Sequence, residues 1–200
     1  MRKWVSIVLM LLLLSLAGTV LAAERVPLRV AVLPVLDQTG GWLDRDGAAM
    51  LSARLQQEFY VPLNDTLQAV VYVPQTEVLA AYNSLVLDAR TQGKKLTLED
   101  TLRQLALKLP ADLVLNLAVD SWYERTYINW EGDSCTEASA SLTLYGWNQR
   151  TQQPIRKNAS RWVNDDTSAV GGVDQQGSEA LDELLGKLQL RKLIFPLQGK

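Results

Sequence analysis

The chain has 200 residues, with 20 basic and 22 acidic side chains, a formal net charge of −2, one cysteine and no histidine. It lacks the basic surplus that nucleic-acid partners require, so we expect no nucleic acid as a partner. It cannot use histidine-dependent catalysis, histidine-ligated zinc or an internal disulfide.

The N-terminus has the three-part pattern of a cleaved secretory signal peptide. Basic Arg2 and Lys3 precede an apolar run over residues 4–16, and small residues then lead to Val20-Leu21-Ala22. The alternative is a retained anchor, but the run is shorter than the about 20 residues of a spanning helix. We therefore expect a signal peptide over residues 1–22 and a single domain over 23–200. Loss of two basic residues leaves 18 against 22 acidic ones, a net charge of −4.

The first half of the mature chain alternates strand and helix patterns. Residues 28–36 are apolar at nearly every position, which is typical of a strand buried on both faces. A second short strand is predicted at 69–73. Apolar residues at helical spacing predict three helices, over 46–60, 74–92 and 98–109. Thr97 and Asp100 form a capping pattern at the start of the third helix.

The second half changes to a period of two, which predicts long strands. We expect strands over 111–127, 136–147 and 155–164, a loop over 165–174, and a final helix from Ser178. In the first of these strands, odd residues from Leu113 to Val119 face one way and even residues from Val114 to Asp120 the other. The predicted fold is α/β, a single domain with a mixed sheet in the order β-α-β-α-α-β-β-β-α, ending in an antiparallel meander.

The motifs that suggest chemistry are better explained by structure. Gly132-Asp133-Ser134 is predicted to be a turn, and Asp44-Arg45-Asp46-Gly47 to start a helix, because it lacks the further ligands of a calcium loop. Asp165-Asp166 is predicted to be solvated, and Cys135 to be a small residue in a strand or turn rather than a reactive thiol. We therefore expect no catalytic residues, no metal site and no cofactor.

An aromatic-rich stretch over residues 122–130 is the best candidate binding surface. In a strand, Trp122, Ile128 and Trp130 share one face, while Tyr123, Arg125 and Tyr127 share the other. Tyr, Trp and Arg are the residue types that anchor protein interfaces. The alternative is cross-strand packing of these rings within a hairpin. The candidate partner-binding residues are Trp122, Tyr123, Arg125, Tyr127 and Trp130.

Two short segments resemble a family of periplasmic domains. The strand Val30–Leu36, which contains Leu33-Pro34, and the following Asp37-Gln38-Thr39-Gly40 resemble the opening of the superfamily of CsgG-like, TolB N-terminal-like and LpoB-like domains. The segment Ala111–Val119 resembles the strand that opens the family's meander, with Pro110 where a glycine is usual. The resemblance implies a non-enzymatic domain for envelope assembly, secretion or scaffolding.

The expected function is that of a periplasmic or extracellular interaction module, soluble, without a lipid anchor and without a membrane span after signal cleavage. No cysteine follows Ala22-Ala23, which a lipid anchor would require. The expected partners are envelope proteins or a second copy of the chain. The alternatives are a carboxylate-dependent hydrolase of the envelope and a small-ligand carrier.

Overall fold

The computed structural model describes residues 27–58, 69–165, 171–189 and 192–193, so the predicted signal peptide lies outside the described residues. The elements, in chain order, are β1 (Leu28–Val32), β2 (Leu36–Asp37), α2 (Arg45–Glu58), β3 (Val70–Tyr72), α4 (Gln75–Thr91), α5 (Leu98–Lys108), β4 (Leu113–Ile128), β5 (Ser134–Asn148), β6 (Gln153–Asp165) and α6 (Val173–Leu188). The predicted α/β class and mixed sheet are confirmed, with the two-residue β2 as an addition.

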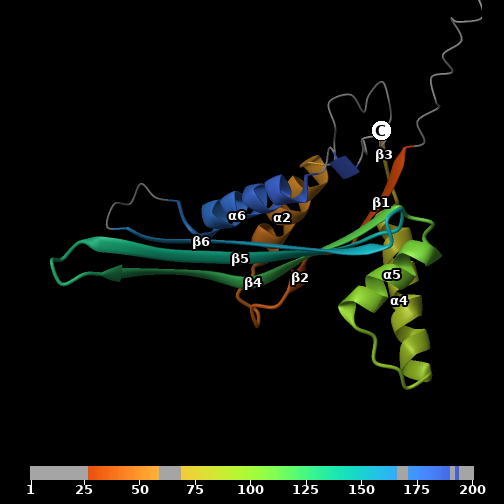
Figure 1. The fold of residues 1–200 in the computed structure, drawn as a ribbon. Helices are drawn as coiled ribbons and strands as arrows, with labels where there is room; N and C mark the ends of the chain where they lie inside the picture. Colours follow the sequence, from red (N-terminus) through yellow and green to blue (C-terminus); the bar gives the residue numbers. More distant parts are fainter. Residues whose placement is uncertain (1–26, 59–68, 166–170, 190–191, 194–200) are drawn as a thin grey trace, which may run out of the picture.

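The strands form one sheet in the order β3-β1-β4-β5-β6, and β2 also pairs with β4 (Figure 1). β1 is parallel to both β3 and β4, whereas β4, β5 and β6 form an antiparallel meander. The register of β4 on β5 shifts by one residue between Val119 and Ser121. Such a bulge bends the strand and changes which residues face each side beyond it.

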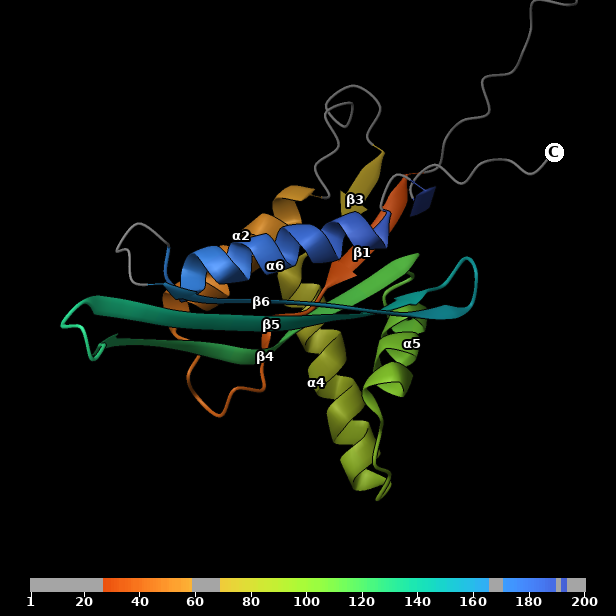
Figure 2. The ribbon, with the colours of Figure 1, turned by 60° about the vertical axis from the view of Figure 1, so that its left-hand side comes forward.

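The inner part of the sheet is covered on both faces. Helices α2 and α6 lie on one face, and α4 and α5 pack at one end of the other (Figures 1 and 2). The predicted alternation of β4 is confirmed: Leu113, Leu115, Leu117 and Val119 belong to the core beneath α2 and α6, while Val114 belongs to the core beneath α4 and α5.

The meander extends well beyond α4 and α5. Helices α6 and α2 cover one face of the part next to α4 and α5, but no described helix covers the opposite face, and the hairpin tip extends beyond α6 as well (Figure 1). We call this uncovered outer part of the sheet the open face.

Two element boundaries differ from prediction for identifiable reasons, and one agrees. The expected strand over 28–36 is interrupted at Leu33–Val35, because Pro34 has no N–H to donate to a ladder. Helix α5 begins as predicted, with the Thr97 hydroxyl accepting from the Asp100 amide at 3.1 Å. Helix α6 begins at Val173, inside the expected loop and before the expected Ser178, and the Val173 amide donates to the Glu124 carboxylate at 2.6 Å. A tertiary contact thus caps α6, and no capping motif in the neighbouring sequence predicts that the helix starts at Val173.

Candidate interaction face

Strand register brings side chains from three strands together on the open face. Arg125 of β4 pairs with Glu137 of β5, which pairs with Asn164 of β6. One step along, Tyr123 pairs with Ser139, which pairs with Trp162. Residues directly opposite in a sheet point to the same side, so these side chains share one surface.

A network of polar contacts holds the open face. Arg125 Nε donates to Glu137 Oε2 at 2.7 Å, and Trp162 Nε1 donates to Glu137 Oε1 at 3.4 Å. The Arg125 guanidinium carbon lies 5.1 Å from the centroid of the Tyr127 ring. The Tyr127 hydroxyl donates to Asn164 Oδ1 at 2.9 Å. The hydrogen bond from Arg125 to Glu137 and the charge of Glu137 raise the pKa of Arg125. These contacts hold the Tyr127 ring and the Arg125 guanidinium in defined positions in the protein without a partner.

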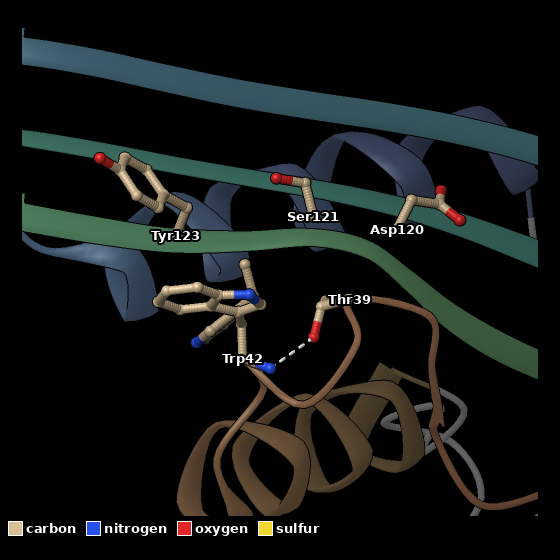
Figure 3. Close-up of a pocket in the computed structure, with 6 residues that line it drawn as sticks. Thr39, Trp42, Asp120, Ser121 and Tyr123 are labelled. Carbon is tan, nitrogen blue, oxygen red and sulfur yellow. Dashed lines mark hydrogen bonds between the residues drawn. The ribbon is translucent and has the colours of Figure 1, made fainter.

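Trp42 borders the open face at the edge of β4, and a short loop places it there. The Asp37 carboxylate accepts from the amide and the hydroxyl of Thr39, at 2.8 and 2.6 Å. The Thr39 hydroxyl oxygen then accepts from the amides of Trp42 and Leu43, at 2.9 and 3.1 Å (Figure 3). The two hydrogen bonds that Thr39 donates to the Asp37 carboxylate, from its hydroxyl and its amide, lower the pKa of Asp37. The hydrogen bonds of Asp37 and Thr39 therefore determine the conformation of the loop that carries Trp42.

The Trp42 ring is 67 % exposed and contacts the Tyr123 ring edge-on, with 6.4 Å between centroids. Trp162, on β6, is 63 % exposed. Neither tryptophan was among the predicted binding residues. Trp162 could have been found, because it lies in the predicted strand over 155–164, and Ser160 and Asn164, which share its side of a strand, are both polar. Trp42 could not, because only the tertiary position of its loop brings it to Tyr123.

A cavity of about 290 Å³ lies where the loop of Trp42 meets the bulge of β4 (Figure 3). Thr39, Trp42, Asp120, Ser121, Trp122 and Tyr123 line it. The Asp120 carboxylate also accepts a hydrogen bond from the Thr143 hydroxyl at 2.6 Å. Typical small-molecule sites occupy about 300–1,000 Å³. This cavity is at the lower limit of that range.

The structure divides the five predicted residues into three groups. Tyr123, Arg125 and Tyr127 lie together on the open face. Trp130 lies at the tip of the β4–β5 hairpin and is 92 % exposed. Trp122 is only 5 % exposed and belongs to the core beneath α2 and α6, so it cannot reach a partner on the surface. The shift in register after Val119 turns Trp122 to the covered face, and helices from distant parts of the chain then bury it.

The described acidic side chains form no metal site. No group of three or more His, Cys, Asp or Glu residues that could hold a metal ion occurs within the described ranges. The predicted role of Asp165-Asp166 lies outside them, since neither side chain is described. Cys135 is a free thiol and is buried, as a small strand residue would be. Within the described part of the chain, none of the helices has the length and apolar character needed to cross a bilayer.

The chain matches no family model and no curated protein. It is similar in structure to the hypothetical protein CT253 from Chlamydia trachomatis, with a TM-score of 0.48, 11 % identity, and coverage of 85 % of this chain and 99 % of that one. For the lipoprotein GNA1162 from Neisseria meningitidis the TM-score is 0.41 and the identity 18 %, with coverage of 80 % of this chain and 99 % of that one. For the LpoB C-terminal domain from Salmonella enterica the TM-score is 0.36 and the identity 16 %, with coverage of 72 % of this chain and 88 % of that one.

All three TM-scores are below 0.5 and all three identities are below 20 %. Similarities at this level carry no conclusion about the function of this chain. The resemblance to CsgG-like, TolB N-terminal-like and LpoB-like domains stays a prediction.

Proposed function

We propose that this chain is an exported, non-enzymatic interaction module of the cell envelope, which binds a partner protein through its open face. The observation that carries this proposal is that Tyr123, Arg125, Tyr127 and Trp162 lie on a sheet face that no described helix covers, with Trp42 beside them. Aromatic residues and arginine are enriched at the centres of protein interfaces. The predicted signal peptide and the family resemblance both favour the cell envelope.

The alternative functions have less support in the site. A carboxylate-dependent hydrolase needs free acidic groups that face a substrate, but Glu137 is engaged by Arg125 and Trp162, and Asp120 by Thr143. A small-ligand carrier needs an enclosed apolar cavity. The cavity beside Trp42 is small and includes Thr39, Asp120 and Ser121 in its wall.

The test is capture of envelope proteins on the immobilised mature chain, compared with Trp42→Ala and Trp162→Ala. Both tryptophans are largely exposed, so their removal leaves the core intact. The matched controls are Leu87→Ala on α4 and Leu107→Ala on α5, which are 65 % and 64 % exposed but lie away from the open face. Truncation of an interface anchor weakens binding about tenfold or more. We expect both Trp variants to lose a partner that both Leu variants retain.

Equal capture by all four variants would contradict the proposal. A partner lost only with the Leu variants would move the interaction to the α4–α5 surface. Melting temperatures of all four proteins must match that of the unmodified protein for the comparison to count.

A further inference from the structure

The outer half of β4 is an uncovered sheet edge. β1 pairs with β4 only at Leu113–Leu115, and β2 only at Ala118 and Val119. Over residues 120–128, β4 pairs with β5 alone among the described residues. An uncovered strand edge presents N–H and C=O groups that another extended chain can pair with.

The direction of these backbone groups follows from the ladder. The carbonyls of Leu115 and Val119 accept from the amides of Leu33 and Gln38, so both point away from β5. Their partners on β5 are Gly146 and Leu142, and the pairing type alternates along an antiparallel ladder. Because β5 has no bulge, every second β5 residue after Leu142, including Ala138, Thr136 and Ser134, keeps the same pairing type. The β4 residues opposite them therefore also direct their backbone N–H and C=O groups away from β5, which we call outward positions. They are Glu124, Thr126 and Ile128, together with Trp122 opposite Ala140, which lies next to the bulge beside the Trp42 loop.

The opposite edge of the sheet is protected. The outward carbonyl of Asn158 on β6 accepts from Lys187 of α6 at 2.8 Å. Arg161 of β6 also forms an ion pair with Glu183 of α6 at 2.8 Å. Side chains of α6 thus reach the β6 edge, whereas the backbone of β4 beyond Val119 pairs, among the described residues, only with β5.

The surroundings of the β4 edge are acidic. Glu124 points to the side of α6, where its carboxylate accepts from the Val173 amide. Asp174 follows Val173 in α6, and the Asp44 carboxylate accepts from the Gly47 amide at 2.7 Å, beside the Trp122 ring of β4. Burial and the charges of Asp44, Glu124 and Asp46 raise the pKa of Asp174. The one basic side chain of the outer strand, Arg125, points to the open face and is paired with Glu137. An added strand would therefore meet negative charge on its α6 side.

We infer that the β4 edge over residues 124–128 is a strand-addition site for an extended, basic segment of a partner protein. Backbone hydrogen bonds would supply affinity, and alternate Lys or Arg side chains would face the acidic group formed by Asp44, Asp46, Glu124 and Asp174. This inference rests on the proposed function and specifies how the partner binds. A second copy fits less well, because pairing two β4 edges would bring two acidic groups together, and like charges in close contact are unfavourable.

The experiment uses a ten-residue peptide of alternating lysine and valine as the probe, with a glutamate–valine peptide as the charge control. Binding to the mature chain is measured by fluorescence anisotropy. Amide hydrogen exchange, followed by NMR, is measured with and without the lysine peptide. We expect slower exchange at the amides of Glu124, Thr126 and Ile128, and no binding of the glutamate peptide.

Two proline variants test the role of the edge. Thr126→Pro removes an outward N–H without removing a donor from the β4–β5 ladder. Ser160→Pro is the matched control, since Ser160 alternates with Asn158 and faces outward on β6. We expect Thr126→Pro to weaken the lysine peptide about tenfold, the equivalent of about one hydrogen bond, and Ser160→Pro to leave affinity unchanged.

Three results would overturn the inference: unchanged exchange at the three β4 amides, equal binding of both peptides, or equal weakening by both proline variants. Protection of these amides in the free protein that grows with protein concentration would make a second copy the occupant and also overturn it. The exchange measurement needs no variant, so it decides even if Thr126→Pro fails to fold. If Trp42→Ala and Trp162→Ala lose the envelope partner while Thr126→Pro retains it, the proposed function stands and strand addition fails.

Discussion

The indole of Trp122 packs directly against Gly177 of α6, in the space that a β-carbon at position 177 would occupy. On its other side the ring approaches Gly47 of α2, where an added β-carbon would lie 2.9 Å from Cζ2 of Trp122. One ring of β4 therefore sets how closely the N-terminal turns of two helices approach the sheet. Both glycines are buried, so neither can shift toward solvent without opening the core.

Gly177→Ala should destabilise the fold by about 1–3 kcal/mol, because the added methyl group overpacks against Trp122. Gly186→Ala on the same helix is the matched control, since a β-carbon there meets nothing within 4 Å. It should raise stability by up to about 1 kcal/mol, the helix-propensity difference between Gly and Ala. Urea denaturation of the two variants measures both effects. Equal stability of the two would contradict the packing described for Trp122.

Trp130→Ala should leave the melting temperature nearly unchanged, because the side chain is 92 % exposed at the hairpin tip. If Trp130 anchors the partner, the same change should weaken partner binding at least about thirtyfold, equal to about 2 kcal/mol. Thermal melts and binding titrations on the same sample decide this. Unchanged affinity would remove the tip from the proposed surface.

Tyr127→Ala should weaken partner binding to a similar degree, but it also removes the ring beneath Arg125. Tyr127→Phe keeps the ring and loses only the hydrogen bond to Asn164, so it should retain most of the affinity. Binding titrations of both variants separate the ring from the hydroxyl. If Tyr127→Ala unfolds the protein while residual affinity remains, Tyr127 serves packing rather than recognition.

Cys135→Ser should cost no more than about 1 kcal/mol, as for a conservative change away from special features. The thiol is free and lies 3.9 Å from the Asp133 carbonyl, which a serine hydroxyl can also use as an acceptor. Chemical denaturation measures the cost. A loss of several kcal/mol, or an obligate disulfide-linked dimer on a non-reducing gel, would show that Cys135 has a larger role.

Asp174→Asn should stabilise the protein at neutral pH but not in acid. Burial and the charges of Asp44, Glu124 and Asp46 raise the pKa of Asp174 above its ordinary value of 3.8. The folded state therefore holds this proton more tightly than the unfolded state, and stability is lost as pH rises from about 4 through the folded pKa. Melting temperatures of variant and unmodified protein should converge near pH 3 and separate by pH 7. A difference that grows toward low pH would have the wrong sign.

The element types of this chain could be predicted because they depend on local patterns. A period of two over residues 111–164 gave the meander and its two faces, and helical spacing with Thr97 gave α5. Boundaries set by distant contacts could not be predicted in this way. Helix α6 starts at Val173 because the Glu124 carboxylate, from a strand 49 residues earlier, caps it.

The candidate site shows the same division. Sequence alternation alone placed Tyr123, Arg125 and Tyr127 on one side of a strand and Trp122 on the other, because side chains in a strand point to opposite faces by covalent geometry. Only the tertiary structure decided which side is covered, since burial depends on where α2 and α6 pack. That packing buries Trp122, leaves the other three on the open face, and adds Trp42 and Trp162 from segments far away in the chain.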